Sequence, residues 1–162
     1  MNAKPHIRRA EPSDARAIAD VLRDMGWFAH ITGELPQETE RRVADQLALC
    51  GNEREHTVLV AEDDAGAVVG YVAMHWFPNL MRGMDGYVSE LFLREAARGH
   101  GIGAALLEAV KRAGVERGAT RLMLFNRRER ESFQRGFYPK HGWTERDDVG
   151  FFMLDLDDEV LP

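Results

Sequence analysis

Residues 90–107 read Glu-Leu-Phe-Leu-Arg-Glu-Ala-Ala-Arg-Gly-His-Gly-Ile-Gly-Ala-Ala-Leu-Leu, and the rest of the chain can be interpreted around this stretch. An apolar strand passes through a polar turn into three glycines at every second position, Gly99, Gly101 and Gly103, and then into an apolar helix. Glycine allows positive φ and a close backbone approach, and the unpaired N–H groups and dipole of a helix start favour an anion. Arg98 adds a cation suited to bidentate phosphate contact. The stretch therefore predicts a phosphate-binding corner.

One interpretation of this corner is a dinucleotide site, because Gly99-x-Gly101-x-x-Ala104 satisfies a loose dinucleotide fingerprint. Such a fold places its fingerprint in the first strand–helix unit and then winds several parallel units. Here a predicted hairpin precedes the glycines, and Asn126 stands where a ribose-binding Asp or Glu is expected. Arg127 and Arg128 would nevertheless suit a 2′-phosphate, so an NADP-binding domain remains the less favoured alternative.

Length and composition restrict the class of protein. The 162 residues suit one domain spanning 1–162, and the net charge of −6 argues against nucleic-acid and anionic-membrane partners. The single cysteine, Cys50, excludes an internal disulfide and a cysteine-rich zinc site. No apolar run approaches the ~20 residues of a membrane span, and the N-terminus has no signal-peptide core. The six histidines show no close pairing on one helix face, so we expect no metal site. The cysteine usage and the lack of a membrane span or signal-peptide core lead us to expect a cytoplasmic protein.

The hydrophobic pattern predicts one compact α/β domain. Strands are expected at 7–9, 57–62, 68–76, 87–93, 121–125 and 151–156, with the turn 63–66 closing an antiparallel hairpin. Helices are expected from Ser13 or Asp14 to Gly26, and at about 37–49, 102–117 and 130–141. Two longer loops, 27–36 and 77–86, are flanked by side chains that would line an acceptor pocket or belong to the core: Trp27, Phe28, Trp76, Phe77, Met81 and Met84.

Two motifs resemble those of the GNAT superfamily of acyl-CoA-dependent N-acyltransferases. Arg98-x-x-Gly101-x-Gly103 resembles the family's Arg/Gln-x-x-Gly-x-Gly/Ala motif. Phe137-Tyr138-x-x-x-Gly142-Trp143 resembles its Phe-Tyr-x-x-x-Gly-Phe ending, with Trp in place of the last Phe. The resemblance covers residues 87–143. Where the family usually has Asn and Ala ahead of the tyrosine, this chain has Glu131 and Gln134, although Asn126 and Ser132 lie nearby.

The resemblance implies a mixed sheet that splays at the cofactor site, with helices on both faces. It implies acetyl-CoA as co-substrate, with the pantetheine arm pairing to the main chain near Leu91 and Leu93 as an added strand would. The diphosphate would rest on the amides of the glycine turn. The implied cofactor-binding residues are Leu91, Leu93, Arg98, Gly99, Gly101, Ile102, Gly103, Ala104, Asn126 and Tyr138.

The implied reaction is direct attack of a primary amine on the thioester. It needs a neutral amine, a donor for the oxyanion and a proton for sulfur. The resemblance implies Glu90 as the base, a backbone amide near Leu93 as the donor, and the Tyr138 hydroxyl at the sulfur. Because tyrosine has a pKa of about 10 and a thiol about 8.5, we expect Tyr138 to hydrogen-bond to the developing charge rather than to transfer its proton fully.

Two further questions stay open at this point. A CoA-binding module without turnover is the alternative function from another class. The acceptor is not specified by the sequence, so small polyamines, amino acids, aminoglycoside-like compounds and protein amines all remain candidates. The resemblance also allows a homodimer.

Overall fold

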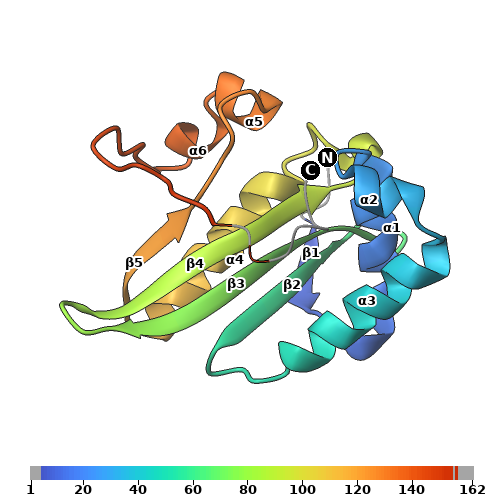
Figure 1. Ribbon diagram of the computed structural model, residues 1–162, viewed down its shortest axis with the longest axis horizontal. Coiled ribbons are helices and arrows are strands. Elements are labelled where there is room, and N and C mark those ends of the chain that lie inside the picture. The colour runs from blue at the N-terminus through green and yellow to red at the C-terminus, as the bar shows by residue number, and fades with distance from the viewer. Residues whose placement is uncertain (1–4, 155, 157–162) are drawn as a thin grey trace. The chain divides into compact units, whose positions relative to one another are not determined.

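The computed structural model describes residues 5–154 and 156, and these fall into two compact units that meet in sequence between Phe125 and Asn126. The first unit contains a five-stranded sheet in the order β1-β2-β3-β4-β5 (Figure 1). Its strands are β1 His6–Arg9, β2 His56–Glu62, β3 Val68–Asn79, β4 Gly83–Leu93 and β5 Ala119–Leu124. The first three pairings are antiparallel and only β4–β5 is parallel. The predicted mixed sheet is confirmed, and it differs from the parallel sheet that a dinucleotide fold requires.

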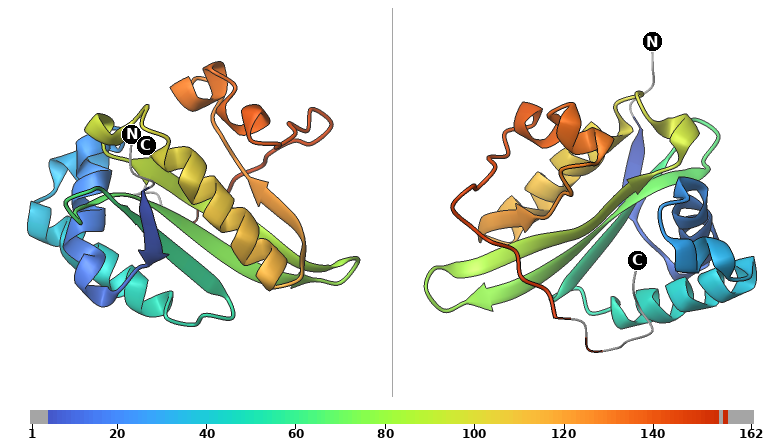
Figure 2. Two further views of the ribbon diagram at one scale, coloured as in Figure 1. Left: turned by 180° about the vertical axis from the view of Figure 1, so that it is seen from behind. Right: turned by 45° about the horizontal axis from the view of Figure 1, so that its top comes forward.

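Helices cover both faces of this sheet, as expected. Three of them, α1 Ala15–Met25, α2 Ala29–Gly33 and α3 Pro36–Leu49, precede β2, and α4 Ile102–Glu116 connects β4 to β5. Figure 1 and the rear view in Figure 2 show α4 on one face, whereas α1 and α3 lie on the other. The short α2 falls inside the segment 27–36 that was predicted to be a loop. Within the described residues, no helix combines the length and the apolar character needed to cross a membrane.

The start of α1 depends on an ion pair rather than on a simple side-chain cap. A single 3-10 turn, Pro12–Asp14, leads into the helix, and Asp14 is buried. Both carboxylate oxygens of Asp14 accept hydrogen bonds from Arg8 on β1, at 2.7 and 2.9 Å, and one also accepts the Glu11 N–H. The Arg8 guanidinium lowers the pKa of Asp14. The helix therefore starts where it was predicted to start. The Asp14 carboxylate, however, does not cap the helix but joins it to β1 through Arg8. The helix ends at Gly26, whose φ is 64°.

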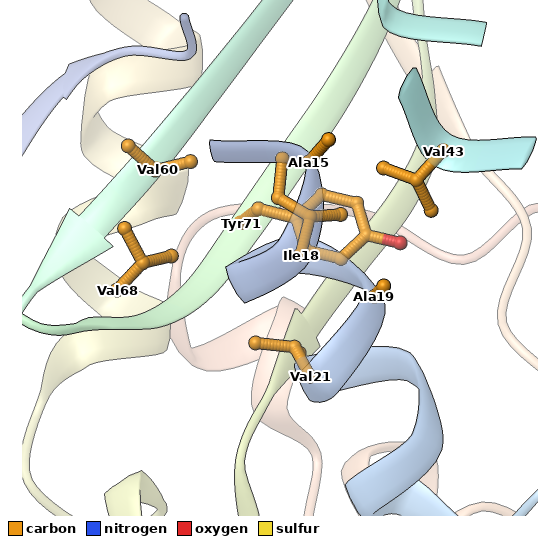
Figure 3. Close-up of a cluster of buried hydrophobic side chains, with 8 residues drawn as sticks. All are labelled: Ala15, Ile18, Ala19, Val21, Val43, Val60, Val68 and Tyr71. Carbon is orange, nitrogen blue, oxygen red and sulfur yellow. The ribbon is translucent and has the colours of Figure 1, made fainter. Parts of the chain in front are cut away.

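The core on this face gathers small and branched side chains from α1, α3, β2 and β3 around one aromatic ring. Figure 3 shows Tyr71 of β3 lying against Ala15, Ile18 and Ala19 of α1. Tyr71 is only 2% exposed. The cluster consists of Ala15, Ile18, Ala19, Val21, Val43, Val60, Val68 and Tyr71. A buried tyrosine of this kind needs a hydrogen-bond partner for its hydroxyl, and Tyr71 donates to Glu90.

The hairpin β3–β4 is longer than the sequence predicts. Segment 77–86 was expected to be a loop, but pairing continues to Asn79↔Gly83 and leaves only 80–82 as the turn. A buried polar network accompanies this extension. Asp85 is fully buried and accepts hydrogen bonds from Asn79 Nδ2 at 2.8 Å and from Arg121 at 2.5 Å. Both bonds are made to Oδ2, while Asp85 Oδ1 has no hydrogen-bond partner among the described residues.

In the second unit, the prediction of a single helix over 130–141 is wrong, because the segment is not one continuous helix. Two short helices replace it, α5 Glu131–Gln134 and α6 Phe137–Lys140. Gly136 separates them with a φ of 65°, a left-handed conformation that interrupts helical hydrogen bonding. The predicted strand 151–156 is also not observed: residues 151–154 and 156 are not in a strand, and Asp155 lies outside the described residues.

The close approach of β3 and β4 gives a stability prediction. A Cβ added at Gly70 would lie 2.9 Å from the Phe92 carbonyl oxygen and 2.2 Å from Leu93 Cδ2. We expect Gly70→Ala to lower the free energy of unfolding by about 1–3 kcal/mol, because the strands must separate. Urea denaturation measures this change. Gly33→Ala is the matched control, since no atom lies within 4 Å of the added Cβ. Equal midpoints for the two variants would contradict the argument.

Candidate functional site

The turn between β4 and α4 presents main-chain amides that have no helical partner. Gly99 and Gly101 both have φ near 79°, a backbone conformation that is strained for residues with a Cβ atom. The first bond of the α4 ladder runs from Ala105 N–H to Gly101 O at 3.0 Å. Helix geometry therefore leaves the preceding amides, those of Ile102, Gly103 and Ala104, without intrahelical acceptors. Their arrangement fits the predicted binding of a diphosphate.

Arg98 lies at the edge of this turn and rests on an aromatic ring. Its guanidinium carbon is 5.4 Å from the ring centroid of Trp27, in the segment after α1. Trp27 in turn contacts Phe92 of β4 edge-to-face, with centroids 6.0 Å apart. Cation–π contact of this kind is worth ~0.5–1 kcal/mol at exposed sites. The turn, the α1–α2 segment and β4 are thus joined through one cation and two rings, and the phosphate role of Arg98 stays a prediction.

The parallel pairing of β5 covers only the first part of β4, because β5 ends at Leu124. Their pairing ends at Val88↔Leu124, whereas β4 continues to Leu93. Arg94 N–H donates to Val69 O of β3 at 2.9 Å. Because backbone groups alternate along a strand, those of Leu93 and Leu91 point away from β3, toward the unpaired edge. An open edge of this kind can hydrogen-bond an added extended chain.

A β-bulge sets the direction of the side chains at the splay. In the β3–β4 register Ala73 opposes Glu90 and Met74 opposes Val88, so Ser89 has no partner residue. Bulges re-aim side chains and often lie beside active sites. Here the Glu90 carboxylate accepts a short hydrogen bond from the Tyr71 hydroxyl, and Ser89 Oγ lies 2.9 Å from His75 Nε2. The predicted base is therefore anchored to the core residue Tyr71.

The charge of Glu90 influences several neighbouring groups. Burial raises the pKa of Tyr71 well above its ordinary value, and the Glu90 carboxylate raises it further. Burial and the same carboxylate also raise the pKa values of Tyr87 and of the Cys50 thiol, so both groups are protonated at neutral pH. A carboxylate surrounded by neutral hydroxyl and thiol groups creates a negative potential that favours a cationic ligand.

Two histidines on neighbouring strands meet beside this carboxylate. His56 Nδ1 of β2 and His75 Nδ1 of β3 are 3.1 Å apart, and the His75 ring stacks on Tyr87 with centroids 6.1 Å apart. Burial lowers the pKa of His75, His56 lowers it further, and Glu90 opposes the shift. His75 is therefore mainly neutral at pH 7.

The sequence analysis did not identify these histidines, because the pattern it considered was a pair of histidines on one helix face. The pair instead joins two strands of a hairpin through their register, His56↔His75. One available signal was the alternation of Tyr71, Ala73 and His75 with Val72, Met74 and Trp76 along β3, which predicts a common face for the first three.

The second unit contains the remaining predicted residues. Asn126 Oδ1 accepts a hydrogen bond from Ser132 at 3.2 Å, while its buried Nδ2 has no hydrogen-bond partner among the described residues. Tyr138 lies on α6 between the rings of Phe137 and Trp143, at centroid distances of 5.1 and 6.3 Å. Burial raises the pKa of Tyr138, although a nearby arginine opposes the shift. Its hydroxyl is therefore a proton donor at neutral pH, and the roles of Asn126 and Tyr138 stay predictions.

Of the two alternatives given for the residues that flank the longer loops, pocket lining or core, the structure favours the core for Trp76. Trp76 is 3% exposed, and its Nε1–H donates to Thr57 Oγ1 at 2.9 Å. Arg117 lies over its ring at 4.9 Å. Trp76 is thus a core residue. Met81 is 86% exposed in the β3–β4 turn. Within the described residues, no group of three or more His, Cys, Asp or Glu is placed to hold a metal ion.

Comparison with known proteins assigns the sequence and the fold to one family. Residues 20–143 match the model of the acetyltransferase (GNAT) family. The chain is 44% identical over 117 residues to an uncharacterized N-acetyltransferase of Archaeoglobus fulgidus, covering 68% of this chain and 74% of that protein. It is 23% identical over 125 residues to thialysine N-epsilon-acetyltransferase of Bos taurus, covering 73% and 72% of the two chains.

A solved structure agrees with the fold. The transcriptional regulator from Bacillus halodurans C-125 superposes with a TM-score of 0.79 at 21% identity, covering 94% of this chain and 100% of that chain. At this level of identity the likeness concerns the fold alone.

The anchored carboxylate gives a prediction for stability at high pH. Because the pKa of Tyr71 is raised in the folded state, its contribution to stability is complete below the unfolded pKa of about 10 and is lost as pH rises above it. We expect the unfolding free energy of the wild type to fall more steeply than that of Tyr71→Phe above pH ~10, by up to ~1.4 kcal/mol per pH unit. Urea unfolding between pH 7 and 11 measures both. Parallel curves would show that Tyr71 titrates normally.

Proposed function

The chain belongs to the GNAT acetyltransferase family and is an acetyltransferase, and we propose that it transfers the acetyl group of acetyl-CoA to a primary amine by direct attack on the thioester. The proposal rests above all on one observation. The edge of β4 is unpaired from Ser89 to Leu93, and the chain passes directly from this edge into the amides that start α4. An extended ligand with a diphosphate at one end fits such a surface.

The residues present suit acetyl-CoA as the co-substrate that the family uses. The proposed diphosphate site consists of the main-chain amides from Gly99 to Ala104, with Arg98 beside them. The proposed pantetheine site consists of the backbone groups of Leu91 and Leu93, which point away from β3. When bound, acetyl-CoA would supply an activated acetyl group and a thiolate leaving group. We also propose a contact from Asn126, whose buried Nδ2 has no partner among the described residues.

Glu90 is the proposed base for the acceptor. An amine is mainly an ammonium ion at neutral pH and must lose a proton before it can attack. The Glu90 carboxylate both attracts the ammonium and takes that proton, either directly or through one water. The Tyr71 hydroxyl holds the carboxylate in one orientation, which keeps its second oxygen available.

Two hydrogen-bond donors complete the proposed mechanism. A backbone amide near Leu93 donates to the oxygen on which negative charge develops. The Tyr138 hydroxyl donates to the leaving sulfur, and its raised pKa keeps it protonated while favouring a hydrogen bond over complete proton loss. These roles need no metal ion.

The acceptor is proposed to be a small cationic amine. The Glu90 carboxylate, flanked by protonated Tyr87 and Cys50, provides a negative potential for an ammonium group. One relative is named for an amine of this class, since thialysine N-epsilon-acetyltransferase is named for the terminal amine of an amino acid. Protein amines form the competing class.

Turnover with a panel of amines tests the function. We expect release of free thiol from acetyl-CoA with at least one of thialysine, lysine, spermidine and a peptide with a free N-terminus. A CoA-binding module would bind acetyl-CoA in a calorimeter without releasing thiol. An NADP-binding domain would instead be protected from thermal unfolding by NADPH and not by acetyl-CoA. Absence of binding heat with both acetyl-CoA and CoA would refute the proposed cofactor site.

Replacement of Tyr138 by phenylalanine tests the proposed donor. We expect Tyr138→Phe to lower kcat by about 10–100-fold, because the variant loses a hydrogen bond made to charge that develops during the reaction. The Kd for acetyl-CoA, measured by calorimetry, should change by less than about threefold, since aromatic packing against Phe137 and Trp143 is retained. Unchanged turnover would remove Tyr138 from the mechanism.

A further inference from the structure

Three side chains form a continuous hydrogen-bonded chain that leads away from the β4 bulge. Ser89 Oγ lies 2.9 Å from His75 Nε2, and His75 Nδ1 lies 3.1 Å from His56 Nδ1. Ser89 is the residue next to the proposed base, at the end of the β4–β5 pairing. His56 is half-buried and follows an exposed turn, residues 51–55. The chain therefore begins beside the proposed base and ends near solvent.

The hydrogen-bond directions within this chain are restricted by tautomer chemistry. A neutral imidazole has one N–H, so one Nδ1 of the pair donates and the other accepts. If His75 Nδ1–H donates to His56, then His75 Nε2 is an acceptor and the Ser89 hydroxyl donates to it. The competing acceptor for that hydroxyl, Ala73 O, lies farther away at 3.4 Å. This arrangement leaves the lone pairs of Ser89 Oγ available to receive a proton.

We propose that Ser89, His75 and His56 form a relay that carries a proton from the acceptor nitrogen to solvent, and this proposal rests on the proposed function. Ser89 is the member that would touch the amine, and His75 and His56 act through it. This relay differs in role from Glu90, which prepares the amine for attack.

The proton balance of the reaction gives Glu90 and the relay one proton each. An ammonium group loses two protons when it becomes an amide. Glu90 takes the first. The second leaves the nitrogen as its bond to the acetyl carbon forms and the carbon–sulfur bond breaks, with the electron pair of that bond going to sulfur. Sulfur is protonated separately, so that one proton in total passes to solvent.

The second proton would move along the relay in a series of short transfers. It passes to Ser89 Oγ as the serine hydrogen passes to His75 Nε2. The Nδ1 hydrogen of His75 passes to His56 Nδ1, and the Nε2 hydrogen of His56 is released to water. Rotation of the hydroxyl and proton exchange with solvent restore the starting tautomers.

Burial and His56 favour a neutral His75 ring at working pH, and Glu90 opposes them. His56 faces it from β2, while Tyr87 stacks on it from β4 and the charge of Glu90 acts on it from the same strand. Cys50, at the end of α3, is coupled to the same carboxylate and is protonated. The lowered pKa of His75 means that the relay would be blocked by protonation only at acid pH.

The test is the pH profile of kcat with saturating acetyl-CoA and the most active amine of the panel named above. We expect an acid limb in the wild type below the ordinary imidazole pKa of about 6.5. His75→Gln and Ser89→Ala should each lower kcat by about 10–100-fold, and His75→Gln should also remove the limb. His56→Gln should also lower kcat, because the relay loses its last member, and it should move the remaining limb to higher pH, because His56 lowers the pKa of His75.

Matched variants separate a relay from a purely structural role. Ser89→Thr keeps the hydroxyl and should restore most of the activity that Ser89→Ala loses. His6→Gln replaces an imidazole on β1 that pairs with Glu62 of β2, and it should retain the wild-type kcat and profile. If His75→Gln does not fold, the two serine variants decide the question.

The outcomes distinguish the relay from the function on which it rests. Wild-type activity combined with unchanged kcat and profiles in the serine and histidine variants would overturn the relay alone. Losses of kcat that leave the acid limb in place and that Ser89→Thr does not restore would also overturn it. No thiol release by the wild type with any amine, despite acetyl-CoA binding, would overturn the proposed function and the relay together.

Discussion

Backbone hydrogen bonding between β4 and β5 stops at Val88 and Leu124, while β4 continues to Leu93, and this separation organises the first unit. A buried parallel pairing would satisfy every backbone group along β4, whereas the splay leaves a short edge with unused donors and acceptors. The same strand then turns into α4 through glycines with positive φ, so the open edge is followed at once by the free amides of a helix start. One interruption in pairing thus places two kinds of backbone recognition in sequence.

The bulge at Ser89 connects this edge to the interior. It turns Glu90 toward Tyr71, whose ring belongs to the α1–α3 core and whose hydroxyl reaches the carboxylate. A charged group so close to a core is tolerated because its oxygen has a donor. The geometry of the candidate base is therefore determined by the packing of helices that do not themselves carry the proposed chemistry.

The sequence predicted the parts of this structure that depend on local patterns. Periodic apolar residues defined α1, α3 and α4, and the glycines marked the turn at Gly99–Gly101 because few other residues adopt positive φ. Features that depend on partners elsewhere in the chain were missed. The extended hairpin is accompanied by the pairing of Asp85 with Arg121, two residues that lie 36 positions apart and that no local pattern connects.

The same difference between local and long-range features applies to the candidate site. Glu90, Leu91 and Leu93 were identified because they belong to one motif, but the histidine pair depends on the register of β2 with β3. The position of Ser89 opposite no partner is likewise a property of two strands and not of one. In the second unit, a single glycine at position 136 divides what hydrophobic periodicity presents as one helix.

The stacking of Arg98 on Trp27 has a spectroscopic consequence. Trp27 is 40% exposed and lies beside the cation of the glycine turn, whereas Trp76 is enclosed in the interior. An indole next to a guanidinium senses any anion that draws that cation away, because the local field and the quenching of its emission both change. Of the three tryptophans, Trp27 is thus an intrinsic fluorophore at the rim of the proposed phosphate site, and the buried Trp76 is shielded from such a change.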